Sequence, residues 1–361
     1  MSSIFGKLFS VSTWGESHGM AVGVVVDGCP AGLEINAEMI QRDLDRRRPG
    51  QNELVTPRNE SDTVEILSGV FDGKTTGTPI SLVVFNKDQR SGDYSEIKKW
   101  YRPGHADLAY DLKYGFRDYR GGGRSSARET IARVAAGSIA RALLSRVCGT
   151  EILSWVSSVG SVESKVDARR VTLEMIEKSP VRCPDATASE AMESLLREVK
   201  AAKDSVGGVL SLCVRRPPRS VGEPVFDRAS ALLAMGMFSI PAVKGFEIGE
   251  GFAAAKMHGS EHNDEIFYED SHFGTRTNHA GGIYGGITSG ADIFCRIAFK
   301  PTATIGIEQK TASAEGENGT FTAKGRHDPC VALRAPVIVE SMAALVLADL
   351  FLEQRARSSL F

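Results

Sequence analysis

The sequence lacks the closely spaced cysteines that would indicate a disulfide framework or a zinc site. Its six cysteines are scattered and none belongs to a Cys-x-x-Cys pair; they are Cys29, Cys148, Cys183, Cys213, Cys295 and Cys330. That spacing does not fit the usual patterns of small secreted domains or zinc modules. The first residues also lack the apolar core of a signal peptide. We therefore expect a protein of the reducing cytoplasm.

Long hydrophobic runs and an excess of positive charge are missing as well. The most apolar late stretch, residues 337–352, is interrupted by Glu340 and Asp349, which argues against a membrane span. The net charge is −2, whereas nucleic-acid binders usually carry a clear basic excess. We therefore expect neither a membrane nor a nucleic acid as partner.

No stretch of the chain has the composition of a linker. Runs of Pro, Ser or like charge that would separate two halves are absent from the 361 residues. The sequence thus predicts a single domain over residues 1–361. Whether the residues after about 355 form a disordered tail is a question that the sequence leaves open.

Arginine, by contrast, is abundant in the first part of the chain. From Met1 to Arg146 there are 14 Arg and only 6 Lys. The planar guanidinium binds carboxylates and phosphates through two parallel hydrogen bonds. In a nearly neutral protein this bias favours a small ligand with several negative charges. The alternative is a solvated surface with scattered ion pairs.

Strand and helix patterns are mixed along the chain. Apolar, β-branched runs predict strands at residues 22–26, 80–85, 209–214 and 293–299. Helical periodicity predicts helices after an Asn36 cap up to the arginines 46–48, and at 126–144, 191–199 and 336–355. The regular β-α-β alternation of a parallel sheet is missing. We therefore predict an α+β fold with mainly antiparallel sheet.

Three short motifs match the residue pattern of known signatures but lack the surrounding sequence that those signatures require. Residues 15–19 (Gly-Glu-Ser-His-Gly) fit a nucleophile elbow, but strand-forming residues follow where a helix is required. Residues 258–262 fit a zinc motif, yet Gly259 and Ser260 favour a loop. Residues 69–75 fall one residue short of a phosphate-binding P-loop. A serine hydrolase, a zinc enzyme and a nucleoside triphosphatase are therefore disfavoured.

The segment 121–128 (Gly-Gly-Gly-Arg-Ser-Ser-Ala-Arg) is the strongest candidate for an anion site. Glycines let the backbone approach a ligand, and the start of a helix offers free N–H groups to a phosphate. A glycine turn followed by a serine cap is equally compatible with this segment alone. His18 and His105 stand among small neighbours, where a histidine can donate a proton to an anionic leaving group. A lone histidine is nevertheless more often structural.

Two further stretches and one carboxylate could serve a cofactor. Residues 281–286 and 300–304 are rich in glycine and hydroxyl groups, which suit a polar planar cofactor, although alone they would be loops. Asp328 precedes Pro329 and could simply cap a turn.

Taken together, these segments resemble one family. Residues 15–30, 121–137 and 326–334 are similar to the three signature stretches of chorismate synthases, in the same order. Residues 46–50, 102–107, 278–282 and 300–302 agree as well, so the resemblance covers about residues 6–350.

The resemblance implies a lyase of the shikimate pathway, which leads to aromatic amino acids. Its reaction is the anti-1,4-elimination of phosphate from 5-enolpyruvylshikimate 3-phosphate, which yields chorismate and requires reduced FMN without net redox change. It also implies helices layered between antiparallel sheets, and a homotetramer in which a neighbouring subunit completes part of the flavin site. The alternative is a non-catalytic relative that binds a flavin or a phosphosugar.

Family positions imply a role for each matching residue. His18 resembles the acid that protonates the departing phosphate, His105 the histidine beside the flavin, and Asp328 the carboxylate that takes a proton from the flavin. Ser17 and Ser126 resemble hydroxyls that orient these groups. The implied substrate ligands are Arg47, Arg102, Arg128 and Arg334. The implied FMN shell comprises Arg124, Ser125, Ser126, Ala127, His279, Ala280, Gly286, Lys300, Pro301, Thr302, Ala303, Thr304 and Arg326.

One position departs from part of the family. Some relatives carry a basic residue, linked to NADP binding, where this chain has Glu53. We therefore expect a monofunctional enzyme that receives its reduced flavin from an external flavin reductase.

Overall fold

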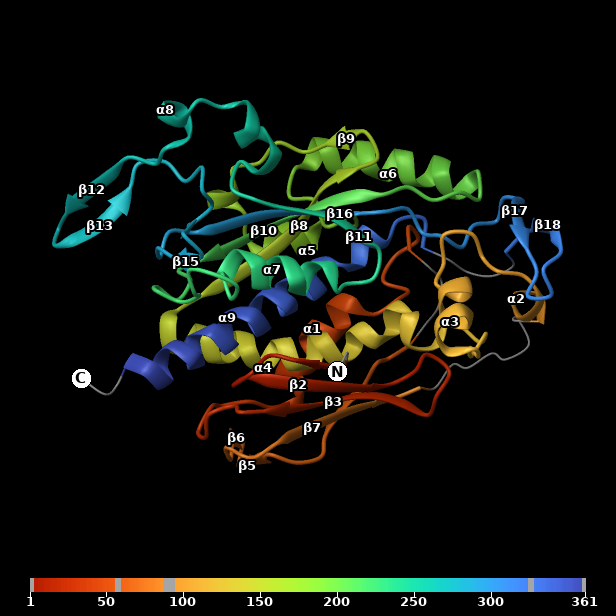
Figure 1. The fold of residues 1–361 in the computed structure, drawn as a ribbon, viewed down its shortest axis with the longest axis horizontal. Helices are drawn as coiled ribbons and strands as arrows, with labels where there is room; N and C mark the ends of the chain where they lie inside the picture. The colour runs from red at the N-terminus through yellow and green to blue at the C-terminus, as the bar shows by residue number, and fades with distance from the viewer. Residues whose placement is uncertain (1–2, 56–59, 87–94, 324–327, 359–361) are drawn as a thin grey trace.

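A computed structural model describes residues 3–55, 60–86, 95–323 and 328–358 of the protein. Two five-stranded sheets enclose a layer of helices (Figure 1). The first sheet has the order β1-β2-β3-β7-β4, with bounds Ile4–Phe5, Ser10–Gly15, Ala21–Asp27, Ile80–Phe85 and Val64–Ile66. The second has the order β11-β16-β10-β8-β9, with bounds Val243–Ile248, Ile293–Phe299, Gly208–Arg215, Glu151–Val159 and Val162–Glu163.

All strand pairs in both sheets are antiparallel, which confirms the predicted α+β class. Four two-stranded hairpins complete the strands that are described. They pair β5 Val70–Phe71 with β6 Lys74–Thr75, β12 Ile266–Glu269 with β13 His272–Thr275, β14 Ile283–Tyr284 with β15 Ile287–Thr288, and β17 Gln309–Ala312 with β18 Asn318–Phe321.

Four helices form the layer between the sheets (Figure 1). They are α1 Ala37–Arg47, α4 Thr130–Cys148, α7 Ala229–Phe238 and α9 Pro336–Ser358. The remaining described helices are α2 Ser95–Lys99, α3 Asp107–Tyr114, α5 Leu173–Lys178, α6 Ala186–Ala201 and α8 Gly259–His262. None of the helices described is long and apolar enough to cross a membrane.

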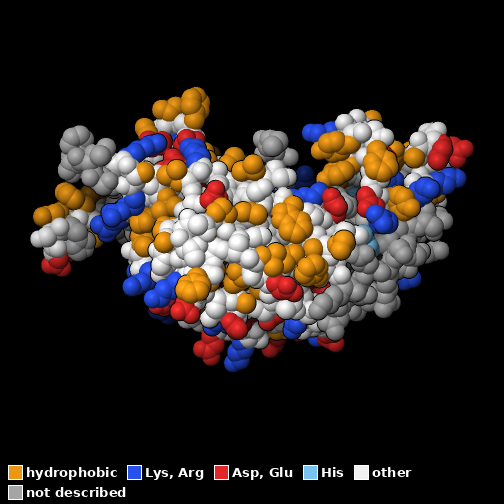
Figure 2. Space-filling view, turned by 90° about the horizontal axis from the view of Figure 1, so that it is seen from below, with side chains coloured by type: hydrophobic (Ala, Val, Ile, Leu, Met, Phe, Trp, Pro, Cys, Tyr) orange, Lys and Arg blue, Asp and Glu red, His pale blue; other side chains and the backbone are white. Residues whose placement is uncertain are grey.

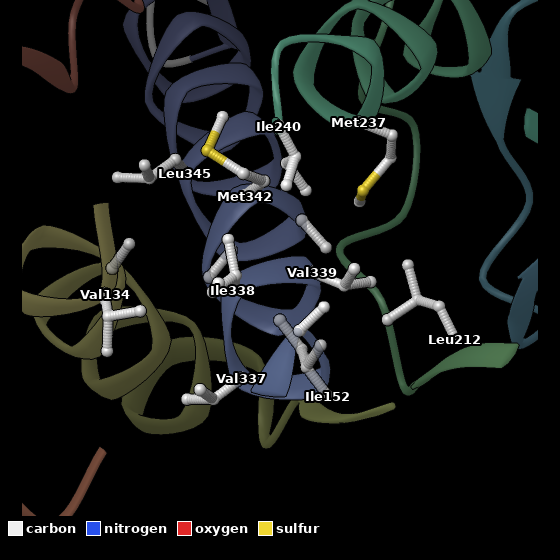
Figure 3. Packing of buried hydrophobic residues seen from close by; sticks show 14 of the residues in the cluster. Val134, Ile152, Leu212, Met237, Ile240, Val337, Ile338, Val339, Met342 and Leu345 are labelled. Atoms are coloured by element: carbon white, nitrogen blue, oxygen red, sulfur yellow. The ribbon is translucent and has the colours of Figure 1, made fainter. Parts of the chain in front are cut away.

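Helix α9 is the centre of the core. It is buried almost all round, as a helix enclosed by other elements should be. Figure 3 shows Val337, Ile338 and Met342 of α9 between α4 and the segment around Ile240. Where α4 meets α9, a Cβ on Gly137 would lie 2.3 Å from the Cβ of Ser341, so only glycine allows this approach. One continuous cluster of buried apolar residues includes members of both sheets and of this helical layer.

The predicted strands are confirmed as β3, β7, β10 and β16, and the Asn36 cap accepts a hydrogen bond from the Met39 amide at 2.8 Å. Several helix boundaries differ from the prediction. Helix α6 spans Ala186–Ala201 rather than 191–199, and α4 ends at Cys148 rather than 144. Helix α4 begins at Thr130 rather than 126, because Ser126 has an extended backbone and caps a short 3-10 turn, Ala127–Glu129. Helix α9 continues to Ser358, beyond the tail boundary near 355, and Arg357 there pairs with Glu223.

None of the described helices covers the outer face of the first sheet (Figure 1). Figure 2 shows hydrophobic side chains gathered on this lower side of the molecule. Trp14 and Phe85 in this sheet, and Leu67 beside it, expose between 41% and 60% of their surface. An exposed apolar face of this kind is a surface that another protein chain could cover.

Candidate active site

The turn between β2 and β3 carries Ser17 and His18. It begins at Gly15, whose φ of +88° favours glycine, and it leads into another strand. The predicted strand after residues 15–19 is thus confirmed as β3, whereas a nucleophile elbow requires a helix at this place. The side-chain amide of Asn86 holds the turn by donating to the carbonyl oxygens of Glu16 at 3.0 Å and Gly19 at 2.7 Å.

Two glycines bring the candidate histidines together. A Cβ on Gly121 would lie 2.5 Å from the ring of His18, and a Cβ on Gly122 would lie 2.9 Å from the ring of His105. Both glycines have positive φ, and they lead into the 3-10 helix η2, Gly123–Ser125. The glycine-rich segment therefore packs its backbone against both histidines, as close backbone approach requires.

Ser17 stands out for its unsatisfied hydroxyl. Its Oγ is buried and has no hydrogen-bond partner among the residues that the structure describes. Buried hydroxyls are nearly always paired, so an unpaired one beside a candidate acid indicates a place for a ligand atom. The same hydroxyl would lie 2.9 Å from a Cβ at Gly121.

His105 is held through one ring nitrogen. Its Nδ1 lies 3.0 Å from Asp107 Oδ1 and 3.0 Å from Arg102 Nη2, so Nε2 is the nitrogen that faces Gly122. Asp107 also accepts hydrogen bonds from Arg102 Nε and Nη2, each at 2.7 Å. Burial opposes the charge of Asp107, but its bonds from Arg102 and His105 outweigh this and hold its pKa far below the usual range.

Arg102 was predicted to bind the substrate directly. In the structure two of its guanidinium nitrogens are engaged by Asp107, and only 6% of the residue is exposed. Its observed contacts therefore support His105. A direct contact with substrate stays a prediction.

Three other predicted arginines gather at the junction of α1, α4 and the start of α9. Arg47 and Arg128 share the carboxylate of Asp62, at 2.7 Å from Arg47 Nη1 and 3.0 Å from Arg128 Nη1. Arg334 donates to Asp328 Oδ2 at 2.9 Å and to the Arg47 carbonyl oxygen at 3.1 Å. The structure thus brings Arg47, Arg128, Arg334 and Asp328 together, as the resemblance implied.

The charge balance of this cluster was not foreseen. The arginines were expected to be balanced by the ligand, yet Asp62, Glu60 and Asp328 already pair with them. Asp62 has a fully buried side chain and a φ of +45°. Burial lowers the pKa of Arg47 to about 10 in spite of Asp62, which still leaves the guanidinium charged at neutral pH.

An apolar pocket adjoins this cluster. Ala127, Thr130, Phe299, Val331, Ala335 and Ile338 line it with Ile240, Pro241 and Ala242, and Arg47, Asp328 and Arg334 stand at its border. A mainly apolar lining with a few charged groups is typical of sites for small-molecule ligands and cofactors. The segment 240–242 was missed in the sequence because it has no motif and follows a helix as an ordinary loop.

The loop after β16 reaches the same region. Lys300 Nζ donates to the Gly104 carbonyl oxygen at 2.5 Å, and Thr302 Oγ1 donates to the Asp328 carbonyl oxygen at 2.9 Å. A Cβ at Gly104 would contact the Cβ of Ala303 at 3.5 Å. Pro301 and Thr304 belong to the same loop. The predicted shell residues 300–304 therefore lie next to His105 and Asp328.

The residues of segment 124–127 have structural partners of their own. Arg124 donates to the Gly15 carbonyl oxygen at 3.0 Å and to Thr13 Oγ1 at 2.7 Å, which fastens the glycine segment to β2. Ser125 Oγ donates to the Gly122 carbonyl oxygen at 2.6 Å, and Ser126 Oγ accepts from the Arg128 amide at 3.3 Å. This segment is thus held rigidly beside His18.

Part of the predicted flavin shell lies elsewhere. His279, Ala280 and Gly286 precede β16, whereas Lys300 follows it, and a seven-residue strand spans about 20 Å. Glu250 N binds the His279 carbonyl oxygen at 2.9 Å, and Ala229 N binds that of Gly286 at 2.8 Å. One chain therefore does not bring all of these residues together. Arg326 and His327 lie outside the described residues.

Asp264 anchors the segment that contains His279 and Ala280. Its carboxylate accepts hydrogen bonds from the amides of His279 at 2.7 Å and Ala280 at 3.1 Å. Thr277 Oγ1 and the Tyr284 hydroxyl donate to it as well, each at 2.6 Å. Burial opposes its charge, but these bonds prevail and lower the pKa of Asp264 to about 2.

Asp264 should therefore stabilise the protein in a pH-dependent way. Its folded-state pKa lies below the ordinary 3.8, so its contribution is complete above about pH 4 and is lost as pH falls toward 2. We expect the difference in free energy of unfolding between wild type and Asp264→Asn to shrink by about 1 kcal/mol from pH 6 to pH 3. Urea titrations at both pH values measure it. A constant difference would contradict the assigned anchor.

No group of three or more potential metal ligands occurs among the residues described. Of the two histidines in the apparent zinc motif, His258 is the N-cap of the four-residue helix α8 and His262 is its last residue. The Glu261 carboxylate accepts a hydrogen bond from the His258 amide at 2.9 Å. The expected loop is thus a single capped helical turn, because His258 N has Glu261 as its partner.

Comparisons with known proteins identify the family. Residues 9–352 match the family model described as chorismate synthase. A chorismate synthase of Synechocystis sp. is 56% identical over 99% of both chains, and one of Rippkaea orientalis is 55% identical over the full length of both. A solved structure titled as a chorismate synthase superposes with a TM-score of 0.78 at 33% identity, covering 97% of this chain and 93% of the other. The chain belongs to the chorismate synthase family.

Proposed function

We propose that this lyase eliminates phosphate from 5-enolpyruvylshikimate 3-phosphate to give chorismate, and that it needs reduced FMN. The observation that carries the proposal is the meeting of His18 and His105 at one glycine turn, near a cluster of arginines. A non-catalytic relative would have no need for both histidines and Asp328. Its relatives named above are enzymes of this kind.

The arginine cluster suits the substrate, which carries two carboxylates and a phosphate. Arg47, Arg128 and Arg334 would bind these anions, because guanidinium groups pair with them through two hydrogen bonds. Glu60 and Asp328 now occupy positions on Arg128 and Arg334 that a substrate anion would take over in part. Arg102 would join this set of substrate ligands only after its guanidinium released Asp107.

The proton transfers are assigned to the groups beside the glycine turn. His18 would protonate the departing phosphate, with the Ser17 hydroxyl orienting the same group. Asp328, held by Arg334 at 2.9 Å, would accept a proton later in the reaction. Ser126 would act by capping the turn that presents Arg128.

The residues present also fit a flavin. The unpaired Ser17 hydroxyl offers a polar partner and the pocket beside Asp328 offers apolar surface for such a group. The segments 124–127 and 300–304 would hold it, with Arg326 added from the family pattern, and His105 would face it through Nε2. Bound in reduced form, FMN supplies electron density that helps the phosphate to leave.

We further propose a homotetramer in which a neighbouring subunit supplies His279, Ala280 and Gly286. Their separation from Lys300 along β16 supports this, because one chain leaves the shell divided. The exposed apolar side chains on the outer face of the first sheet offer surface for such an assembly (Figure 2). The whole chain is treated as one domain, and the continuous core supports this.

The source of electrons is proposed to be an external flavin reductase. Glu53 pairs with Arg197 at 2.9 Å, so this position presents an engaged carboxylate where a cation for NADP would be needed. A monofunctional enzyme fits this. We place it in the cytoplasm without a nucleic-acid or membrane partner, and its six free cysteines support a reducing compartment.

An anaerobic assay tests the proposed function. Purified protein is mixed with 5-enolpyruvylshikimate 3-phosphate and photoreduced FMN, and chorismate absorbance and phosphate release are followed together. We expect equal yields of both, no product with oxidised FMN, and none when NADPH alone is added to oxidised FMN. Tight binding of substrate and flavin without product would favour the non-catalytic alternative. Formation of product with NADPH and oxidised FMN alone would contradict the proposal of an external flavin reductase.

A further inference from the structure

Asn86 is absent from the implied set of site residues, yet it joins two parts of the site. It follows β7 directly, and its amide donates to the Glu16 and Gly19 carbonyl oxygens of the turn that carries His18. Its Oδ1 accepts from Arg128 Nε at 2.5 Å. One side chain therefore touches both the proton-donor turn and the anion-binding cluster.

We propose that Asn86 is a positioning residue that fixes the turn bearing His18 relative to Arg128. Through this link the group that protonates phosphate and a guanidinium that binds the substrate keep one relative position. The inference rests on the proposed roles of His18 and Arg128.

The chemistry of the three partners requires an amide at this position. Arg128 Nε can only donate, and the two carbonyl oxygens can only accept. Asparagine offers one acceptor and two donated hydrogens in this arrangement, so the orientation of its amide is determined. Aspartate has the same shape but lacks the donors, and alanine lacks both functions.

The backbone of Asn86 is fixed independently of its side chain. Its N–H donates to the Met20 carbonyl oxygen at 2.9 Å, which continues the pairing of β3 with β7. A substitution can therefore remove the side-chain link while this backbone contact remains. Substitutions at Asn86 can therefore test the acceptor function and the donor function of its amide one at a time.

Asn86→Asp should affect turnover more than substrate binding. The variant keeps an acceptor for Arg128 but turns a carboxylate oxygen toward two carbonyl oxygens, which should displace the His18 turn. A displacement of about 1 Å at a reacting group can cost about 100-fold. We expect kcat to fall at least about tenfold while KM stays within about threefold of wild type.

Asn86→Ala should change both constants, because Arg128 also loses its partner. Hydrogen–deuterium exchange gives a readout that needs no activity. The Gly19 amide donates to the Glu16 carbonyl oxygen at 3.2 Å, and its exchange should become at least about tenfold faster in both variants. Ser81→Ala on β7 is the matched control, since no hydrogen bond of its hydroxyl occurs among the described residues, and it should resemble wild type.

The outcomes separate positioning from mere stability. A wild-type kcat and unchanged Gly19 exchange in Asn86→Asp would overturn the proposal. The proposal would also be overturned if Asn86→Asp and Asn86→Ala showed the same decrease in kcat and the same increase in KM, together with a lowered Tm. That pattern would indicate a structural role alone. If the wild type itself releases no phosphate, the proposed function fails, whereas the exchange of Gly19 still decides whether Asn86 holds the turn.

Discussion

Gly121→Ala is expected to lower kcat of the elimination about 100-fold, close to the loss that we expect for His18→Ala. A Cβ at this position would lie 2.5 Å from the His18 ring and 2.9 Å from Ser17 Oγ, so the ring must move. Misplacing a proton donor by about 1 Å is enough for such a loss. Steady-state kinetics with reduced FMN in excess measure it.

Gly123→Ala is the matched control for this variant. Gly123 has a φ of +54° against +65° for Gly121, so both substitutions impose a similar backbone strain of about 1 kcal/mol. A Cβ on Gly123, however, would have only Glu16 Cγ near it, at 4.0 Å. We expect kcat to stay within about threefold of wild type. Equal losses in the two variants would assign the effect to the backbone and not to His18.

Much of the fold could be predicted because its signals are local. The strands at 80–85 and 293–299 have the predicted limits, since β-branched runs stand between turn residues. The start of α4 could not be predicted. Ser126 looks like the cap of a long helix, but the segment that packs on His18 and His105 forces short 3-10 turns first. Tertiary contact thus outweighed helix propensity.

The site was predictable where its motifs are contiguous and unpredictable where partners come from afar. The glycine segment and the histidines follow from their local residues. The carboxylates at 60 and 62 come from a loop without a motif, and their pairing with Arg128 depends on how the chain returns to α4. Asn86 was missed for the same reason. The division of the flavin shell follows from the placement of its residues at opposite ends of β16, a strand whose limits the sequence did predict.

A network of ion pairs centred on Glu340 of α9 supports the arginine cluster. Glu340 has a fully buried side chain on α9 and accepts from Arg46 at 2.6 and 2.9 Å and from Arg141 at 2.9 Å. The Ser154 amide donates to it as well, at 3.0 Å. Burial opposes the charge of Arg46, but Glu340 and Glu177 outweigh it and raise the pKa of Arg46. Arg46 directly precedes Arg47, so this network also fixes the last turn of α1.

Glu340→Gln is therefore expected to destabilise the protein by about 3 kcal/mol, because it removes the fully buried carboxylate that Arg46 and the partly exposed Arg141 share. Guanidinium chloride unfolding measures the loss. Glu198→Gln, an exposed position on α6, serves as the control and should change stability by less than about 0.5 kcal/mol. Since α1 loses its anchor, KM for the substrate should also rise in Glu340→Gln at temperatures where the variant is folded. Asp43 also pairs with Arg46 and Arg141. Stability within about 0.5 kcal/mol of wild type would mean that Asp43 or water compensates these two arginines in the variant.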